Sequence, residues 1–560
     1  MKKNNIRQFI ILLSAIMLTC FVSTKLFFRI DLTAEKRYTL SRQTKQLLRQ
    51  LDSPLYVDIF LDGDLPVQFR KLRNSIREMF DDFKTYSASR IVYRFIDPSQ
   101  AANAQERAEN YAILEEEGIR RITVFKTNKD GSQSQQIIFP GAILYYKDRL
   151  TSVNLLSTNT SIHWEERLNA SFETLEYELI KTINILSDDS IGRVAFIHGH
   201  GELSRPETFD VGLEFANYYE VERKAISGQL DALDPYKAII IAKPREPFDE
   251  KDQFIIDRYI MRGGSVMWLI DGANVNTDSL YSLSMTVALP HQLNLEGMLF
   301  TYGARINQGI VMDIVANQIP ITLTDRSSQI TLAPWLYYPL VEPSQNHPIT
   351  RNLDMVWLRY AGYIDTVGLN SEVRKNVLLQ TSPMSRFRGL PAIIRLSEVQ
   401  HTQELQQFNN PNLITAVLLE GQFPSVFRNR NARTMFPELR EQQAQKSVET
   451  KMIVVADGDI ARNDVRNTAQ GIVPSNPLGY DRHTNLTFAN KEFLINALNY
   501  LTDDAGLMNL RNREFRMRLL NKQKVANELL KWQLINLVLP MLLLVIGGVA
   551  YNKWRRYKYA

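Results

Sequence analysis

The stretch "DEKDQFIIDRYIMRGGSVMWLID", residues 249–271, indicates the fold class because it joins a helix to a buried strand. Apolar residues such as Ile256 and Ile260 recur at i, i+4 spacing, which is typical of an amphipathic helix. Gly263 and Gly264 end that helix, and the apolar run that follows has the length of a strand.

The same alternation continues on both sides of this stretch. "RVAFIH" (193–198) and "KAIIIAK" (237–243) predict strands, and residues 207–219 between them predict a helix. The pattern returns with "MIVVADGD" (452–459) and a helix at 490–502. Strands that alternate with helices are typical of a parallel sheet covered by helices on both faces.

We therefore expect an α/β domain that resembles flavodoxin-like and glutamine-amidotransferase-like sheets. Its first part spans residues 191–313, and the chain returns to it at 451–505. The interval 314–450 is less regular and predicts a large β-rich elaboration. The sequence leaves open whether this interval is a separate domain or an insertion within the sheet.

A second α/β region precedes this one. Residues 29–160 read in the order β-α-β-α-β-β, which resembles a thioredoxin-like domain. This region has no C-x-x-C motif, so no redox role follows. A long amphipathic helix in the interval 161–190 connects the two regions.

Two apolar runs lie near the ends of the chain. Residues 9–28 carry a single charge, Lys25, and residues 532–551 carry none. Each run approaches the ~20 residues that span a bilayer, so we expect two transmembrane helices. A cleaved signal peptide is the alternative for the first run, but no small-x-small cleavage site follows it.

Most of the formal net charge of +5 lies just before the second apolar run. Residues 506–531 predict a basic juxtamembrane helix that is either simply solvated or in contact with anionic headgroups or an acidic partner. The rest of the chain is nearly neutral, so no nucleic-acid partner is expected. The candidate residues for membrane or partner contact are Arg511, Arg513, Arg516, Arg518, Lys522 and Lys524.

The turn "FIHGHGEL", residues 196–203, follows the first strand of the predicted parallel sheet. Ligands of open α/β sheets bind beyond the carboxyl ends of strands, and other acidic residues also follow strands here. Turns after strands are, however, rich in Gly and Asp for conformational reasons alone, which favours a structural or partner-contact turn. The candidate crevice consists of His198, Gly199, His200, Glu202, Asp271, Asp457 and Asp459.

Several catalytic classes lack their motifs. The sole cysteine, Cys20, lies in the first apolar run, and the chain has neither G-x-S-x-G nor G-x-x-x-x-G-K-[ST]. The histidines outside the turn have no ligand-like spacing. We therefore expect no catalytic residue, cofactor or metal, and no ATP hydrolysis by this chain itself. A hydrolase that uses His198, His200 and Glu202 remains a minor alternative.

Five stretches resemble the GldG family, the gliding-motility-associated auxiliary proteins of ABC transporters. They are spread over most of the chain: "RIDLTAEKRYTLS" (29–41), "LDGDLPVQFRKLRNSIREMFDDF" (61–83), "IHGHGEL" (197–203), "RYIMRGGSVMWLIDG" (258–272) and "NPLGYDRHTNLTFANKEFLINALNYLTDDAGLMNLRNREFRMRLLNK" (476–522).

This resemblance implies a non-catalytic auxiliary subunit of an ABC transporter complex involved in bacterial gliding motility. Its partners would be a separate permease, a separate ATPase and envelope or gliding-machinery proteins. The resemblance also implies two spans in the inner membrane, a periplasmic middle and cytoplasmic tails at 1–8 and 552–560, an orientation that charge counts alone leave open. The alternative is an extracytoplasmic ligand-binding module of the same transporter.

Overall fold

The computed structural model describes most of the chain and divides it into two units. Its first unit is Met1–Arg513 and its second is Glu514–Ala560. The described residues are 11, 13–15, 17, 39–127, 133–156, 164–188, 192–324, 327–368, 372–400, 405–430, 436–437, 444–469, 471–512 and 522–559.

The N-terminal region of the first unit contains a four-stranded mixed sheet of order β2-β1-β5-β6. β1 pairs with β2 in parallel and with β5 in antiparallel orientation, and β5 and β6 form a hairpin. The strands are β1 (Leu55–Ile59), β2 (Ile91–Phe95), β5 (Gly141–Tyr146) and β6 (Arg149–Asn154).

Helices cover both faces of this sheet. Phe69, Phe80 and other apolar residues of α3 share one core with α2 and α5, while Leu114 of α4 belongs to a smaller core with Phe139. Ser41 caps α2, because its Oγ accepts a hydrogen bond from the backbone N–H of Thr44 at 2.9 Å. The helices are α2 (Arg42–Gln50), α3 (Val67–Tyr86), α4 (Ala104–Glu116) and α5 (Trp164–Ser187).

The apolar stretch at residues 136–146 is divided between two strands. β4 (Gln133–Ile138) ends before Pro140 and pairs with β3 (Ile122–Thr127) in a separate hairpin. Proline lacks the N–H that a ladder requires, so the chain turns there and enters the main sheet as β5.

The large sheet of the first unit joins a parallel half to an antiparallel half in the order β14-β15-β18-β21-β22-β10-β9-β7-β8. Numbered along the chain, the five parallel strands lie in the order 2-1-3-4-5. These strands are β7 (Arg193–His198), β8 (Glu220–Ala225), β9 (Ala238–Ala242), β10 (Ser265–Leu269) and β22 (Thr450–Val455).

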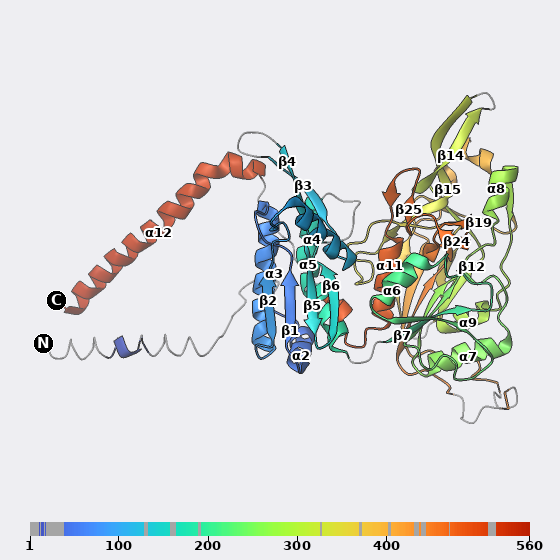
Figure 1. Cartoon of the computed structure of the whole chain (residues 1–560), viewed down its shortest axis with the longest axis horizontal. Coiled ribbons are helices and arrows are strands. Elements are labelled where there is room, and N and C mark those ends of the chain that lie inside the picture. Colours follow the sequence, from blue (N-terminus) through green and yellow to red (C-terminus); the bar gives the residue numbers. More distant parts are fainter. Residues whose placement is uncertain are drawn as a thin grey trace. The chain divides into compact units, whose positions relative to one another are not determined.

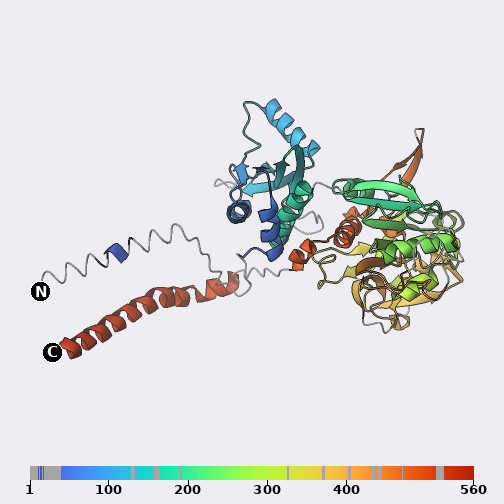
Figure 2. The ribbon, with the colours of Figure 1, turned by 90° about the horizontal axis from the view of Figure 1, so that it is seen from below.

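Both faces of the parallel half are buried beneath helices, as the sequence predicts (Figure 1). Val194 and Phe196 of β7 point into the core that α6 and α11 cover, whereas Ala195 and Ile197 point into the core of α7 and α9. These helices are α6 (Phe209–Ala216), α7 (Glu250–Met261), α9 (Glu296–Tyr302) and α11 (Asn490–Leu501). Figure 2 shows this sheet and the N-terminal sheet as distinct parts of the chain.

The interval 314–450 contains strands that extend the large sheet. Antiparallel pairing continues outward from β22 through β21 (Ile414–Gly421), β18 (Val373–Gln380), β15 (Ser327–Pro343) and β14 (Ala316–Thr324). Three two-stranded ribbons lie beside them. Two of these contribute to a core that includes Trp335 and Tyr337, and one contributes Ala304 and Ile364 to the core of α7 and α9. The ribbons are β11 (Met285–Ala288) with β20 (Ala392–Arg395), β12 (Ala304–Asn307) with β17 (Tyr363–Thr366) and β13 (Gly309–Asp313) with β19 (Ser385–Gly389).

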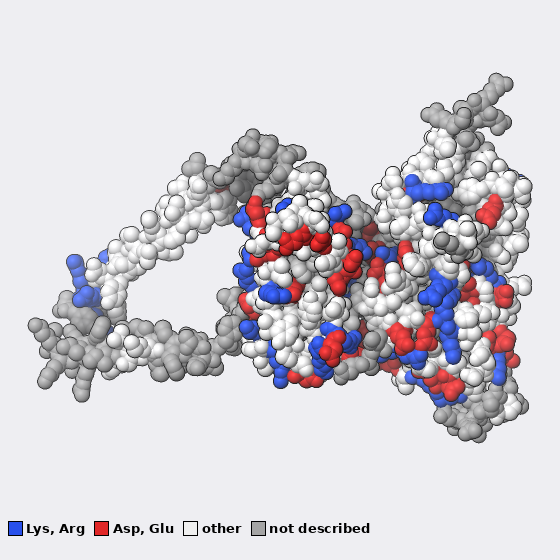
Figure 3. Space-filling view, viewed as in Figure 1, with Lys and Arg blue, Asp and Glu red and all other residues white. Residues whose placement is uncertain are grey.

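The second unit contains α12 (Lys522–Tyr559), which includes the predicted span 532–551. Within the described residues, one helical segment is long and apolar enough to cross a membrane, Lys531–Lys558, with a mean hydropathy of 2.3. Figure 3 shows α12 without charged side chains over most of its length and with Lys and Arg near its C-terminal end. The predicted span 9–28 lies almost entirely outside the described residues.

Candidate functional site

All seven predicted crevice residues lie at or beyond the carboxyl ends of parallel strands. His198 ends β7, and Gly199, His200 and Glu202 form the turn after it. Asp271 follows β10, and two further carboxylates follow β22. The structure therefore brings the seven residues to one edge of the large sheet, where the acidic residues and His200 form two clusters.

The first cluster is centred on Lys243, which directly follows β9. Its Nζ lies 2.8 Å from Oδ2 of Asp271 and 2.5 Å from Oδ2 of Asp459. Oxygens of Asp271, Asp457 and Asp459 lie within 4.8 Å of one another. The Lys243 side chain is 13% exposed, so this ammonium group is held among the carboxylates and largely shielded from solvent.

Asp457 and Asp459 have pKa values that are shifted in opposite directions. Burial, Asp459 and Asp271 raise the pKa of Asp457 well above its usual value, so its neutral form is favoured. Burial also acts to raise the pKa of Asp459, but Lys243 outweighs it and lowers that pKa to about 2. Asp457 is held by backbone N–H groups of Asp459 and Arg359, each at 2.7 Å from one of its oxygens.

This chemistry fits an internal ion pair better than a metal centre. Mg²⁺ and Ca²⁺ take six or more oxygen ligands, several of them carboxylates or carbonyls. Here the ammonium group of Lys243 already supplies a positive charge to Asp271 and Asp459. Lys243 offsets one of these two negative charges, and Arg462, 3.4 Å from Asp459, supplies a second positive charge from the chain itself.

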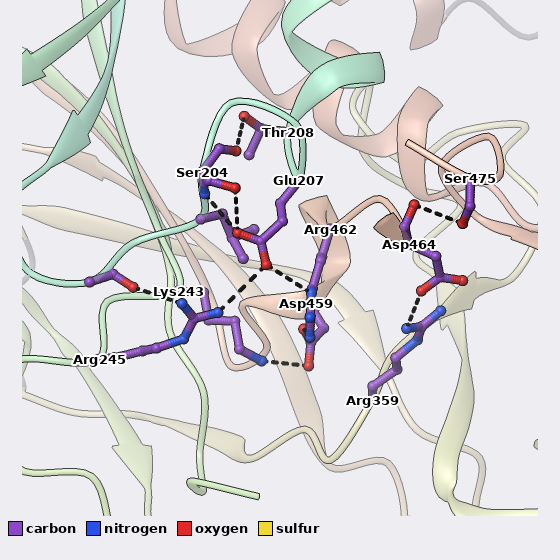
Figure 4. A network of polar contacts seen from close by, with 12 residues as sticks. Ser204, Glu207, Thr208, Lys243, Arg245, Arg359, Asp459, Arg462, Asp464 and Ser475 are labelled. Atoms are coloured by element: carbon purple, nitrogen blue, oxygen red, sulfur yellow. Dashed lines mark hydrogen bonds and ion pairs between the residues drawn. The ribbon is translucent and has the colours of Figure 1, made fainter. Parts of the chain in front are cut away.

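Glu207 links this cluster to the turn after β7 (Figure 4). Its Oε1 lies 3.3 Å from Nε of Arg462 and 3.8 Å from Nη2 of Arg245. Arg462 also reaches Asp459 at 3.4 Å, and Arg245 donates to the carbonyl of Gly201 at 3.2 Å. Each cation in this chain of contacts therefore has an acceptor within the protein.

The network around Lys243 is close to charge balance when Asp457 is neutral. Arg359 adds one more pair, since its Nη1 lies 3.0 Å from Oδ1 of Asp464. Four carboxylates then face four cations: Asp271, Asp459, Glu207 and Asp464 against Lys243, Arg245, Arg359 and Arg462. None of these cations was singled out from the sequence. Lys243 and Arg245 in "AKPRE" follow a strand, so the rule that selected Asp271 could have found them.

The second cluster surrounds His200, which is 7% exposed. Its ring stacks on Phe248 with centroids 3.7 Å apart, and its Nε2 lies 3.0 Å from Oδ2 of Asp252. Nδ1 of His200 lies 3.4 Å from Oε1 of Glu202. Burial acts to lower the pKa of His200, but Glu202 and Asp252 outweigh it and raise that pKa above its usual value. His198, in contrast, is exposed and belongs to neither cluster.

The chain closes the edge between β7 and β9 with its own backbone. The parallel strand order reverses at this point, and such a reversal is where open α/β sheets bind ligands. Here the N–H groups of Arg245 and Glu246 donate to the carbonyl of His200 at 2.7 and 2.9 Å. Leu203 N–H donates to the carbonyl of Ala242 at 2.9 Å. Hydrogen bonds at His200 and at Leu203 therefore join the loop after β7 to the loop after β9.

Backbone also covers the ends of β10 and β22. A Cβ added at Gly272 would lie 2.5 Å from Cα of Gly362, and Gly309 N–H donates to the carbonyl of Gly272 at 3.0 Å. Gly362 N–H donates to the carbonyl of Ala456 at 2.8 Å. Glycine at these contacts allows the segments around β13 and β17 to lie directly on the strand ends.

The basic residues predicted to contact a membrane or partner have different positions. Arg511 lies in η4 (Leu507–Asn512) and is 8% exposed, which contradicts a role in surface contact. Its guanidinium packs over Tyr177 of α5, because η4 folds back onto the core of the N-terminal region. Lys522 and Lys524 begin α12, whereas Arg513, Arg516 and Arg518 lie outside the described residues.

Two segments match known families. Residues 192–497 match the family described as an ABC-type uncharacterized transport system. Residues 34–145 match a domain of unknown function. The first match includes all five parallel strands, both clusters at their carboxyl ends and most of the β-rich interval.

Two individual proteins are also similar. An uncharacterized protein of Borreliella burgdorferi is 19% identical over 581 residues, covering 99% of each chain. The N-terminal domain of mmIFT52 is 12% identical, and the alignment covers 56% of this chain and 98% of that domain. Its TM-score of 0.31 is too low to support an argument about fold.

Proposed function

Because the chain belongs to the family described as an ABC-type uncharacterized transport system, we propose that it is a non-catalytic auxiliary subunit of an ABC transporter. The match over residues 192–497 carries this proposal. In it, a separate permease forms the transport path and a separate ATPase hydrolyses ATP. The chain contributes contacts that hold or position these partners.

The apolar segment Lys531–Lys558 supports attachment to the membrane. We propose a second span at residues 9–28, on the strength of their sequence alone. With both spans in the inner membrane, the tails are cytoplasmic and the large middle is periplasmic. A role in gliding motility, with envelope or gliding-machinery partners, rests on the resemblance of five sequence stretches and is the narrower form of the proposal.

The strand orders support two specific folds. The five parallel strands follow the order 2-1-3-4-5, which is the flavodoxin-like order. The order β2-β1-β5-β6, with β5 antiparallel to β1, supports a thioredoxin-like N-terminal domain. We propose both as frameworks that present binding surfaces, since neither requires a catalytic residue.

At the carboxyl edge of the parallel strands, backbone and ion pairs leave little room for a ligand, so we favour contact with a partner protein there. Backbone hydrogen bonds to His200 O and Ala242 O fill the place where a ligand would enter between β7 and β9. The charged side chains beside it are held in ion pairs within the chain. A hydrolase that uses His200 and Glu202 is disfavoured for a related reason, since both side chains are enclosed by their own contacts.

The proposal is tested by purifying the full-length chain in mild detergent through a C-terminal tag and identifying bound proteins by mass spectrometry. We expect a multi-span permease and a P-loop ATPase in comparable amounts. A matched variant in which residues 532–551 are replaced by an unrelated transmembrane span should stay in the membrane but no longer co-purify with these partners. Recovery of the wild-type chain alone, stable and monodisperse, would contradict the proposal.

A further inference from the structure

A large cavity lies in the first unit, away from the carboxyl edge of the parallel strands. Its volume is about 940 Å³, and its walls come from α5, β6, the end of α6, the start of α11 and η4. Its lining includes five cationic side chains, and two of them, Lys181 and Arg511, have no described carboxylate within ion-pair distance. The other three are Arg120, Arg121 and Lys491. The cavity is large enough for a small organic molecule.

Arg511 is a buried cation without an anionic partner among the described side chains. Its Nη2 donates to the carbonyl of Arg351 at 3.3 Å, and its Cζ lies 5.7 Å from the ring centroid of Tyr177. Its Nε and Nη1 are buried and form no hydrogen bond within the described structure. Burying a guanidinium with only part of its donors satisfied is costly, so this arrangement favours an added acceptor.

Lys181 lies near the same ring, Tyr177, and closer to a second ring, Tyr218. Its Nζ lies 4.1 Å from the ring centroid of Tyr218 and 5.9 Å from that of Tyr177. Glu178 acts on it electrostatically, but no described carboxylate lies within the 4 Å of an ion pair. Cation–π contacts hold Lys181 in place and leave the ammonium group without a counter-ion.

Other carboxylates of the cavity compete weakly for these cations. Glu214 pairs with Lys491 at 2.9 Å and approaches Arg120 at 3.7 Å. Burial raises the pKa of Glu492, which favours its neutral form. Residues 115–117 at the end of α4 are exposed, so solvent and salt screen their charges.

We propose that this cavity binds a small molecule that carries an oxyanion, a phosphate or a carboxylate, and that Arg511 and Lys181 are its counter-ions. The guanidinium fork provides directional N–H donors, and the ammonium group adds a second positive charge. Tyr218 lines the cavity beside Lys181, and the buried ring of Tyr177 lies within 6 Å of both cations. This site is separate from the carboxyl edge and does not depend on the proposed transporter partners.

The test uses the full-length protein in detergent at constant ionic strength, with chloride as the balancing anion. Inorganic phosphate and dihexanoyl phosphatidic acid are the two probes, measured by calorimetry and by thermal unfolding. We expect saturable binding and a rise in Tm, because a ligand of the folded state stabilises it. Arg511→Gln and Lys181→Gln should each weaken binding by about tenfold or more, since each removes a charge-assisted contact. Arg205→Gln removes an exposed positive charge and should change nothing.

The two probes distinguish the source of the oxyanion. Saturation by phosphate supports a free anionic metabolite, whereas saturation by the lipid alone supports a headgroup as the ligand. The Tm of Arg511→Gln without probe should equal or exceed that of the wild type, because an unpaired buried cation is removed. Failure of both probes to saturate, or unchanged binding in both variants, would overturn the proposal.

Discussion

Two charged regions of the first unit contrast in how their cations are satisfied. At the carboxyl edge of the large sheet, Lys243 sits between Asp271 and Asp459, and neighbouring arginines contact further carboxylates. At the cavity, Arg511 and Lys181 face aromatic rings and have no described carboxylate within ion-pair distance. Charged residues thus gather at both places, but only the first set is neutralised by the chain.

This difference shows that a position typical of ligand sites is not sufficient for ligand binding. The carboxyl edge has the expected topology and acidic residues, yet backbone and ion pairs close it. The cavity has no recognisable motif in the sequence but retains unused hydrogen-bond donors. Unsatisfied groups therefore indicate where an external molecule is needed.

The largest effect is expected from Lys243→Met. Removing the ammonium leaves Asp271 and Asp459 buried together without their cation, which should lower the free energy of unfolding by about 3–5 kcal/mol. Urea denaturation of the variant against the wild type measures this loss. Lys237→Met, at a side chain 41% exposed, is the control and should remain within about 0.5 kcal/mol. An equally small change for Lys243→Met would show that the edge is not held by this ion pair.

Gly272→Ala should have an intermediate effect. The new Cβ would lie 2.5 Å from Cα of Gly362 and 2.7 Å from the carbonyl oxygen of Gly309, so backbone must move. We expect a loss of about 1–3 kcal/mol in the same denaturation experiment. Gly297→Ala in α9, where a Cβ meets nothing within 4 Å, should be neutral or slightly stabilising. Equal behaviour of the two variants would argue against a closely covered strand end.

His200→Gln should produce a smaller, pH-dependent effect of about 1 kcal/mol. The raised pKa of His200 means that protonation stabilises the folded state. Its contribution is therefore complete below the unfolded value of 6.5 and is lost as pH rises through the folded pKa. Denaturation midpoints of variant and wild type between pH 5 and pH 9 should converge toward the alkaline end. The exposed His483→Gln is the control, and a difference that grows with pH would contradict the assignment.

Much of the large sheet could be predicted from local patterns. The strand at 193–198 is recognisable as a continuous apolar run, because both of its faces are buried. The helix at 250–261 is recognisable from an apolar stripe with helical spacing. β8 was missed because "EVERKA" alternates charged residues, as an edge strand does. The pairing of β18 and β21 with β22 was left open, since long-range antiparallel pairing leaves no local signature.

The sequence predicted where the candidate-site residues lie, but not that they form ion pairs within the chain. Asp271, Asp457 and Asp459 do converge, as strand ends of one sheet should. The same rule could have placed Lys243 at this edge, but its ion pairs with Asp271 and Asp459 depend on side-chain packing that the rule does not describe. Arg511 shows the opposite error, since a basic residue beside an apolar span suggested surface contact, while tertiary packing on Tyr177 buries it.

The most direct test of the auxiliary role is the ATP hydrolysis rate of the co-purified permease and ATPase, reconstituted in vesicles with and without this chain. We predict that the chain alone hydrolyses no ATP and that adding it changes the rate of the reconstituted pair in a saturable way. Hydrolysis by the chain alone, or a rate that is the same at every amount of added chain, would contradict the account.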